Sequence, residues 1–333
     1  MTIGILQTAR VGRLEEKHRR HHMKRHIVLA LLLGVGTLCL SVVGAQESAK
    51  VIEVEQLRDN LFVFRGEGGG GNVAVFVTTE GVVVVDSKNP GWGQPILDEI
   101  KTLTSNPVTT VINTHSHADH VSGNAAFANT VEFVAHEITK ANMEAMRPYT
   151  GRTEPPVNVF EETDGQGLPT RTFTDRMSLG TGRDQIDLYY FGRAHTGGDA
   201  WVVFPSLRTL HAGDAFLGKR VPFLDAANGG SGVDIPDTLQ KAHDTIENVD
   251  TIITGHSTQA TWEDLNEWAA FNRDFLEMVR AGRTAGKTVD EIASSWVKPS
   301  RYADYDSSNA GSVRRNIQVI VEELERLERL ARR

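Results

Sequence analysis

Apolar β-branched residues recur in short runs, separated by turn residues, over the first half of the chain. Residues 60–65, 72–77 and 81–86 are three such runs, and together they predict a meander of three strands. The apolar spacing over 94–105 predicts a helix, and residues 108–113 a further strand. Because strands and helices alternate here, the pattern favours an α/β fold built in layers.

The apolar pattern changes in the last quarter of the chain. Before this change of pattern, three more short strands are expected, over 186–191, 200–204 and 209–211. Beyond it, apolar residues recur at helical spacing over 263–281 and 313–331, with charged residues between them. We therefore expect a C-terminal helical extension over 259–333. Its leucine-rich end leaves the oligomeric state open.

The N-terminal segment has the order of residues that is typical of a secretory signal peptide. Basic residues precede an apolar run over 27–43, and small residues follow it. We expect a signal peptide over 1–45 that is cleaved before Gln46, which predicts a periplasmic or secreted protein with no stable membrane insertion after cleavage. An uncleaved anchor is the alternative, and Met23 is a second candidate start.

Charge and cysteine content narrow the classes of function. The chain has a net charge of −8, and removal of residues 1–45 leaves 28 basic against 41 acidic residues, a charge of about −13. This balance disfavours a nucleic-acid partner, since binding to nucleic acid depends on neutralising phosphates. The single cysteine, Cys39, lies in the leader, so a metal would have to be held by histidines and carboxylates.

Histidines and aspartates gather where predicted strands end. Four of them fall within the six residues 115–120, His-Ser-His-Ala-Asp-His, directly after the strand over 108–113. Three more follow later glycine-bearing strand ends. Imidazole and carboxylate are ligands of zinc and related ions, and seven of them suit a site for two divalent ions. The seven candidate metal ligands are His115, His117, Asp119, His120, His195, Asp214 and His256.

The succession HxHxDH, HTGGD, HAGD and GH over residues 58–258 resembles the metallo-β-lactamase superfamily. The resemblance implies a catalytic domain over 46–258 with the αββα sandwich fold of that family, in which two β-sheets pack face to face, helices lie outside and metals bind in a cleft at one edge. It also implies that His115, His117 and His195 hold one metal.

The resemblance further implies a second metal, held by Asp119, His120 and His256. Asp214 would bridge the two metals, as in glyoxalase II-like members of the family. Asp86, at the end of the run 81–86, resembles the strand-terminal aspartate that orients the metal-binding loop in this family.

Two further residues, which follow Asp214 in the sequence, are candidates for binding the substrate. Lys219, next to Arg220, and Asn228 are candidates for substrate contacts, the lysine for a substrate carboxylate. The alternatives are that the lysine is a solvated surface charge and that the asparagine is a turn residue. The remaining histidines after residue 45 are His136, His211 and His243, which we interpret as structural or surface residues. For His211, which lies just before Asp214, a role in supporting the metal ligands stays open.

Two glycine-containing stretches resemble phosphate-binding loops without their context. The run 66–71 lacks the Gly-Lys-Ser/Thr ending of such a loop, and we expect a mobile hairpin tip. Residues 281–288 match a relaxed loop pattern but follow a helix-like run rather than a strand. Since Thr288 and Glu291 have the spacing of a capping box, a helix end and a new helix start are expected there.

The residues and the resemblance together predict an exported hydrolase of a small molecule. Its two Zn²⁺ ions, with Fe or Mn as alternatives, would share a hydroxide that attacks an ester, thioester, lactone or amide carbonyl, and Asp119 would orient that hydroxide and relay its proton.

Three alternative functions stay open. Export favours β-lactam hydrolysis, but zinc β-lactamases of the family usually carry Cys or Ser where Asp214 stands. An iron-dependent persulfide dioxygenase is the second alternative, because it shares the fold and many ligand positions. The third is a metal-binding protein without catalytic activity.

Overall fold

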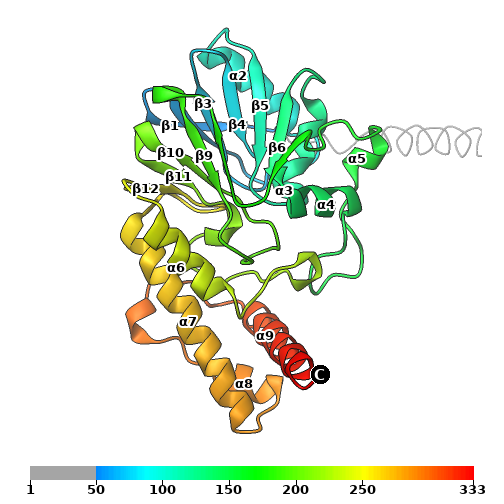
Figure 1. The fold of residues 1–333 in the computed structure, drawn as a ribbon, viewed down its shortest axis with the longest axis vertical. Coiled ribbons are helices and arrows are strands. Elements are labelled where there is room, and N and C mark those ends of the chain that lie inside the picture. The colour runs from blue at the N-terminus through cyan, green and yellow to red at the C-terminus, as the bar shows by residue number, and fades with distance from the viewer. Residues whose placement is uncertain (1–49) are drawn as a thin grey trace, which may run out of the picture. The chain divides into compact units, whose positions relative to one another are not determined.

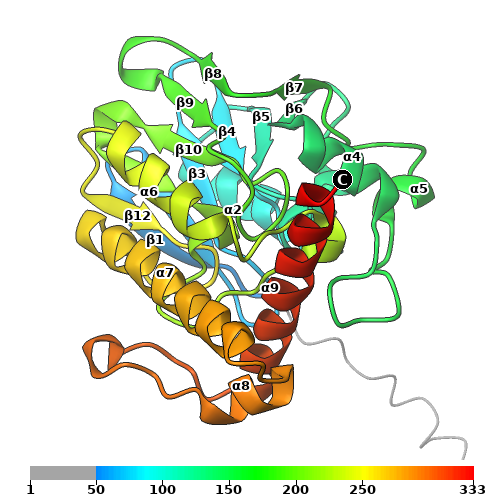
Figure 2. The ribbon, with the colours of Figure 1, turned by 60° about the horizontal axis from the view of Figure 1, so that its bottom comes forward.

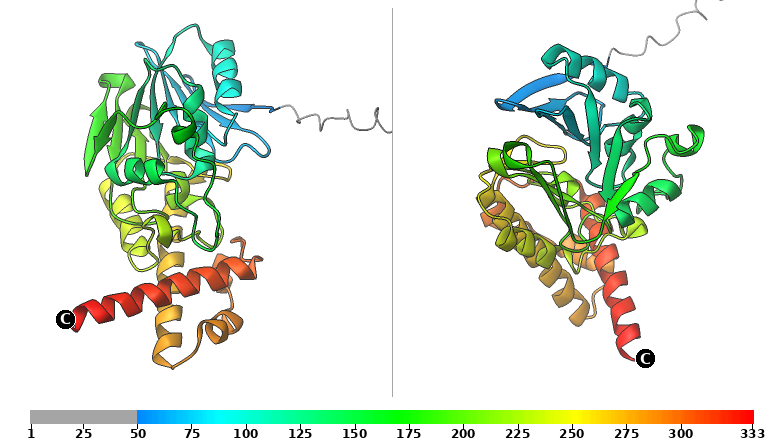
Figure 3. Two further views of the ribbon diagram at one scale, coloured as in Figure 1. Left: turned by 90° about the vertical axis from the view of Figure 1, so that its right-hand side faces the viewer. Right: turned by 45° about the horizontal axis from the view of Figure 1, so that its top comes forward.

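The protein is built around two β-sheets that face each other, as Figure 1 and the right-hand view of Figure 3 show. The computed structural model describes residues 50–333, so the predicted signal peptide and Cys39 lie outside the described residues. The first sheet runs in chain order from β1 to β7. Its strands are β1 (Glu53–Arg58), β2 (Leu61–Arg65), β3 (Val73–Val77), β4 (Val82–Val85), β5 (Val108–Asn113), β6 (Glu132–His136) and β7 (Arg171–Phe173).

The first sheet changes direction at its centre. The strands from β1 to β4 pair antiparallel, which confirms the predicted meander, and those from β4 to β7 pair parallel. All four valines of β4 are buried, since this strand is covered on both faces. The carboxyl ends of β4 and β5 therefore meet at one edge, and this is where the first histidine motif begins.

The second sheet has the strand order β13-β12-β11-β10-β9-β8. Only β11 and β12 pair parallel; the other neighbours pair antiparallel. Its strands are β8 (Arg176–Leu179), β9 (Ile186–Tyr189), β10 (Trp201–Phe204), β11 (Thr209–His211), β12 (Thr251–Ile253) and β13 (Ala260–Thr261).

A hydrophobic core fills the space between the two sheets. Phe76 of β3 meets Phe204 of β10 edge to face, with ring centroids 5.2 Å apart, and Val202 and Ile253 belong to the same buried cluster. A second cluster lies on the outer face of the first sheet, where Ile96 of α2 packs against it. This is the predicted αββα sandwich.

Helices cover the outer faces of both sheets (Figure 2). The α-helices are α2 (Gly93–Leu103), α3 (Ala118–Val121), α4 (Glu137–Ala145), α5 (Val159–Glu162), α6 (Ile235–Thr245), α7 (Trp262–Thr284), α8 (Val289–Ser295) and α9 (Ala310–Ala331). Short 3₁₀ turns lie at η1 (Ser122–Ala126), η2 (Gly182–Asp184), η3 (Pro205–Leu207), η4 (Gly213–Phe216), η5 (Ala226–Asn228) and η6 (Ser300–Tyr302). No helix within 50–333 has the length and apolar character needed to cross a bilayer.

The C-terminal helices share a core with the second sheet. Trp268 of α7 is fully buried, and its indole N–H donates to the carbonyl of Ala215 at 2.9 Å. Its ring stacks on Phe216 at 5.6 Å, and Ile317 of α9 belongs to the same cluster. Both predicted C-terminal helices are thus confirmed as α7 and α9, which cross each other in the left-hand view of Figure 3.

Helix α8 begins where the capping box was predicted. Thr288 accepts a hydrogen bond from the backbone N–H of Glu291, and the Glu291 side chain accepts from the N–H of Thr288. The preceding stretch ends α7 rather than forming a phosphate-binding loop.

A buried carboxylate joins α9 to the loop that carries His195. Glu323 accepts hydrogen bonds from Arg193 at 2.9 Å and from Ser231 at 2.7 Å, and it is only 6% exposed. Arg193 precedes His195 by two residues. The last helix therefore supports the loops beside the histidine cluster, although the boundary proposed after residue 258 stays a prediction.

Substitution of Trp268 tests whether the C-terminal helices belong to the main core. We expect Trp268→Ala to lower the free energy of unfolding by about 3–5 kcal/mol, because it empties a fully buried position. Leu327→Ala, at a position that is 39% exposed, is the control and should change it by less than about 0.5 kcal/mol. Chemical denaturation followed by circular dichroism measures both, and equal small effects would contradict a shared core.

Candidate metal centre

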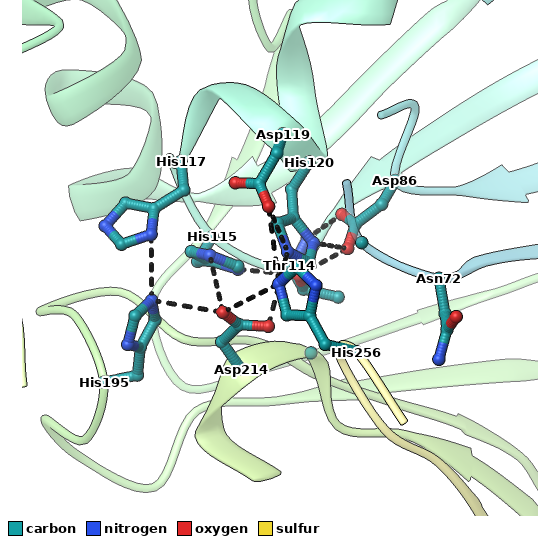
Figure 4. A network of polar contacts seen from close by, with 12 residues as sticks. Asn72, Asp86, Thr114, His115, His117, Asp119, His120, His195, Asp214 and His256 are labelled. Atoms are coloured by element: carbon teal, nitrogen blue, oxygen red, sulfur yellow. Dashed lines mark hydrogen bonds and ion pairs between the residues drawn. The ribbon is translucent and has the colours of Figure 1, made fainter. Parts of the chain in front are cut away.

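All seven candidate metal ligands come together at one edge of the sandwich (Figure 4). His115 and His117 lie in the loop after β5, and Asp119 and His120 in the short helix α3. His195 lies in the loop between β9 and β10. The other two follow the parallel strands β11 and β12; they are Asp214 and His256. The ligands converge because the strands that precede them end at the same edge of the sandwich.

Two groups of potential ligand atoms form within this cluster. In the first group the ligand atoms lie within 4.8 Å of one another, and the members are His115, His117, His195 and Asp214. Nε2 of His195 lies 3.1 Å from Nδ1 of His117. The second group meets the same criterion and consists of Asp119, His120 and His256.

The carboxylate of Asp214 lies between the two groups. Its Oδ2 is 3.7 Å from Nε2 of His195 and 3.3 Å from Nε2 of His256. Its Oδ1 is 3.3 Å from Nε2 of His120. Figure 4 shows this carboxylate facing histidines on both sides, which is the placement that a shared ligand requires.

Two buried atoms of the cluster make no hydrogen bond within the described part of the chain. They are Nε2 of His115 and Oδ1 of Asp214. A buried polar atom without a partner costs about 1–3 kcal/mol, so such atoms are rare in a folded protein. A divalent cation would satisfy both, and imidazole nitrogen with carboxylate oxygen is a donor set that zinc accepts. The residues present therefore fit a metal ion.

Burial prepares the first group of imidazoles for metal binding. Burial lowers the pKa of His115 well below its usual value, and the neighbouring His120 lowers it further. Burial and the nearby His117 likewise lower the pKa of His195. Both rings are therefore neutral at neutral pH, as a metal ligand must be.

The central carboxylate is ionised despite its burial. Burial would raise the pKa of Asp214, but the charges of His256 and His120 outweigh it and hold this pKa well below its usual value. The centre therefore offers a buried anion beside the neutral nitrogens of His115 and His195, which favours a cation.

Asp86 lies behind the second group and orients one of its rings. Its carboxylate accepts hydrogen bonds from Nδ1 of His120 at 2.7 Å and from the backbone N–H of Thr114 at 2.8 Å. It also accepts from the Thr114 hydroxyl, whose oxygen lies 3.1 Å from Nδ1 of His115. Asp86 has φ of 64°, a left-handed conformation that is unfavourable for this residue. These bonds hold it there and turn both Nε2 atoms toward the centre.

Asp225 orients the first group, although no sequence pattern singles it out. Its carboxylate accepts from Nε2 of His117 at 2.7 Å and from the amide of Asn228 at 2.7 Å. It also accepts from the backbone and hydroxyl of Thr150, each at 2.8 Å. Burial would raise the pKa of Asp225, but the hydrogen bonds and charge of His117 hold it well below its usual value. Because Nε2 is engaged, Nδ1 of His117 faces the centre.

The glycine run 66–71 connects the antiparallel strands β2 and β3, as expected of a hairpin tip, and it also forms one wall of the centre. The N–H of Gly71 donates to the carbonyl of Asp119 at 3.0 Å, and the ammonium of Lys88 donates to the carbonyl of Gly71 at 2.7 Å. Lys88 is fully buried, and burial, followed by the charge of Arg65, lowers its pKa to about 8. A Cβ on Gly71 would lie 2.2 Å from the ring of His120, so this wall needs a residue without a side chain.

The two candidate substrate residues are engaged elsewhere. The ammonium of Lys219 lies among three carboxylates, at 2.8 Å from Asp264, 3.3 Å from Glu267 and 2.7 Å from Asp304. Asn228 is buried and donates to Asp225 instead of lying at an open rim. Their expected substrate contacts gain no support from these placements.

The histidines outside the cluster have structural contacts. Nε2 of His211 lies 3.1 Å from the carbonyl of Asn72, and its Nδ1 accepts from the N–H of Gly213. His136 accepts from the first turn of α4 and stacks on Tyr190 at 4.0 Å. His243 stacks on Trp262 at 5.2 Å.

Comparison with known proteins agrees with this geometry. Residues 66–256 match the family model described as the metallo-beta-lactamase superfamily. The chain is 28% identical over 255 residues to the metallo-beta-lactamase type 2 of Elizabethkingia meningoseptica, covering 73% of this chain and 91% of that protein. It is 25% identical over 198 residues to the metallo-beta-lactamase IND-1 of Chryseobacterium indologenes, covering 58% and 74% respectively.

The fold is also similar to that of solved structures. A metallo-beta-lactamase from Pontibacter korlensis superposes with a TM-score of 0.54 at 19% identity, covering 67% of this chain and 99% of that chain. At this identity the likeness concerns the fold alone.

Asp225→Asn tests the role of the carboxylate behind His117. The amide cannot replace the charged acceptor, so we expect about 10–100-fold weaker metal binding, the usual effect of losing such a partner. Competition with a chelating dye measures it. Asp244→Asn, on the exposed side of α6, is the matched control. Equal metal affinity in both variants would contradict the role of Asp225.

Gly71→Ala tests the glycine wall. Its methyl group would displace the His120 ring, so we expect reduced metal content after dialysis, measured by inductively coupled plasma mass spectrometry. Gly68→Ala is the control in the same loop, because a Cβ there meets open space while its φ of 73° introduces backbone strain alone. Full metal content in Gly71→Ala would show that the wall tolerates a side chain.

Proposed function

The chain belongs to the metallo-beta-lactamase superfamily, and from that premise we propose that it is a hydrolase of a small carbonyl substrate, using two zinc ions. The observation that carries this proposal is the Asp214 carboxylate facing two groups of ligands, with Oδ1 and Nε2 of His115 buried and without hydrogen bonds. An ester, thioester, lactone or amide is the class of substrate.

Each residue of the centre has a place in this proposal. One zinc ion would be held by His115, His117 and His195, and the other by Asp119, His120 and His256, with Asp214 shared between them. Bound zinc would polarise the substrate carbonyl and lower the pKa of water, which makes a protein nucleophile unnecessary.

Asp119 is the residue we assign to proton transfer. It is 28% exposed, while His115 and His120 are fully buried, so it lies on the open side of the centre. Its carboxylate is 3.3 Å from Nε2 of His256. From there it can orient an attacking water and accept its proton.

The residues behind the ligands keep the geometry fixed. Asp86 and Asp225 each hold the outer nitrogen of a ligand imidazole, and the backbone of Gly70 and Gly71 packs on α3. Catalysis by positioned groups requires such support, because small displacements of a reacting group reduce the rate strongly.

β-Lactam hydrolysis is the second candidate function. The similarity to two metallo-beta-lactamases supports it, and the chain covers 91% of the first of them. Asp214 opposes it, because zinc β-lactamases of the superfamily usually carry Cys or Ser at this position. The superfamily also includes members that are not hydrolases.

Location and partners are part of the same proposal. The signal-like segment 1–45 supports export to the periplasm or beyond, and the acidic charge supports a small-molecule substrate over a nucleic acid. Fe and Mn also bind imidazole and carboxylate ligands, so the metal that the protein holds in the cell has to be determined by experiment.

Hydrolysis of a substrate panel tests the proposal. Zinc-loaded protein starting at Gln46 is assayed with a chromogenic cephalosporin, a 4-nitrophenyl ester, a thioester and a lactone. We expect at least one kcat/KM above about 10⁴ M⁻¹s⁻¹, the lower end for ordinary enzymes, with complete loss on chelation. His115→Ala should reduce it by more than about 100-fold, because a buried ligand is lost.

His243→Ala, on α6 outside the groups of ligand atoms and stacked on Trp262, is the matched control and should keep full activity. Turnover of the cephalosporin alone would establish the second candidate. Rates equal to the His115→Ala blank on every substrate, with zinc bound, would overturn the hydrolase proposal; oxygen uptake with a persulfide by the iron-loaded protein would replace it.

A further inference from the structure

A guanidinium from the last helix lies beside the metal centre. Arg315 belongs to α9, outside the residues 66–256 that match the family model. Its guanidinium lies over the ring of Phe223, with the central carbon 5.0 Å from the ring centroid. The feature is therefore specific to the C-terminal part of this chain.

Phe223 connects Arg315 to the first group of ligands. Its ring centroid is 5.6 Å from that of His117 and 5.4 Å from that of His195. Its carbonyl accepts a hydrogen bond from Nδ1 of His195 at 2.5 Å. One aromatic side chain thus separates the guanidinium from two of the candidate metal ligands.

Arg315 has unused hydrogen-bonding capacity. Its Nε is buried without a partner, and one terminal nitrogen donates to the hydroxyl of Ser312 at 3.1 Å. Among residues 50–333, no carboxylate forms an ion pair with Arg315 or with Arg152. By contrast, Arg314 on the same helix is paired with Asp290 at 2.6 Å.

The surroundings of Arg315 favour an anion. Burial and then the positive charge of Arg152 lower the pKa of Arg315, while Asp225 raises it; the group stays protonated because arginine is effectively always charged. Asp225 is already engaged by His117, Asn228 and Thr150. Two neighbouring cations that pair with no carboxylate among residues 50–333 form a ready site for an anion.

A glycine keeps the loop of Arg152 against Arg315. Gly151 has φ of 83°, and a Cβ there would lie 2.9 Å from Cδ of Arg315. The loop that carries Arg152 therefore packs directly on the stem of the other arginine, and both cations belong to one surface.

We propose that Arg315, assisted by Arg152, binds an oxyanion group, a carboxylate or a phosphate, of the substrate whose carbonyl is hydrolysed at the metal centre. The planar guanidinium matches either oxyanion with two parallel hydrogen bonds. Arg315 is on this basis a specificity-determining residue. The assignment of the anion to a substrate rests on the proposed hydrolase function.

Two esters with the same leaving group test the site. Mono-4-nitrophenyl glutarate carries a carboxylate, and 4-nitrophenyl butyrate is neutral. We expect Arg315→Gln to raise KM for the charged ester by about tenfold or more, the usual loss for a hydrogen bond to a charged group, and to leave kcat/KM for the neutral ester within about twofold. Arg152→Gln should give a smaller change in the same direction, and Arg314→Gln none.

Anion binding is measured separately by isothermal titration calorimetry of the same purified proteins with glutarate and with inorganic phosphate. We expect at least about tenfold weaker binding to Arg315→Gln than to the wild type or Arg314→Gln. The anion that binds the wild type more tightly identifies the group carried by the substrate. This result stands even if neither ester is hydrolysed, an outcome that counts only against the hydrolase function.

Two results would overturn the anion site. One is that each anion binds the wild type and Arg315→Gln with equal affinity, or that neither protein binds either anion. The other is an equal loss of activity on both esters in Arg315→Gln, which would indicate that the arginine only supports the fold around Phe223.

Discussion

The centre depends on one buried carboxylate that faces two sets of imidazoles. Asp214 brings a negative charge into a region where His115 and His120 are fully buried, and such a charge is stable only beside compensating groups. Its Oδ2 lies 3.7 Å from His195 and 3.3 Å from His256. The ligand arrangement, the supporting carboxylates and the proposed chemistry all follow from the need to balance this charge with cations.

The fold supplies the positions that this balance requires. Parallel strands end at one edge of each sheet, and the loops after them carry the ligands, while Asp86 and Asp225 stand behind the imidazoles. The C-terminal helices complete the arrangement, because Glu323 of α9 supports the loop that holds His195. The part of the chain beyond the family match thus contributes to the surroundings of the centre and presents Arg315 beside it.

Much of this could be predicted from the sequence, since local patterns determine it. The valine run of β4, the dense motif over 115–120 and the capping box at Thr288 each indicate their structure within a few residues. Asp225 could not be found in this way, because its partner His117 is 108 residues away and no spacing links them. Lys219 was a candidate for a substrate contact because the sequence shows its charge. The sequence does not show the three carboxylates that surround its ammonium group in the fold.

The shared role of Asp214 is tested most directly by the number of zinc ions bound per chain in the wild type and in Asp214→Asn. Inductively coupled plasma mass spectrometry measures it after saturation and dialysis. We expect two zinc ions in the wild type and a clear loss in the variant, because the neutral amide removes the charge that both sites share. Fewer than two in the wild type, or the same content in Asp214→Asn, would contradict a centre organised around this carboxylate.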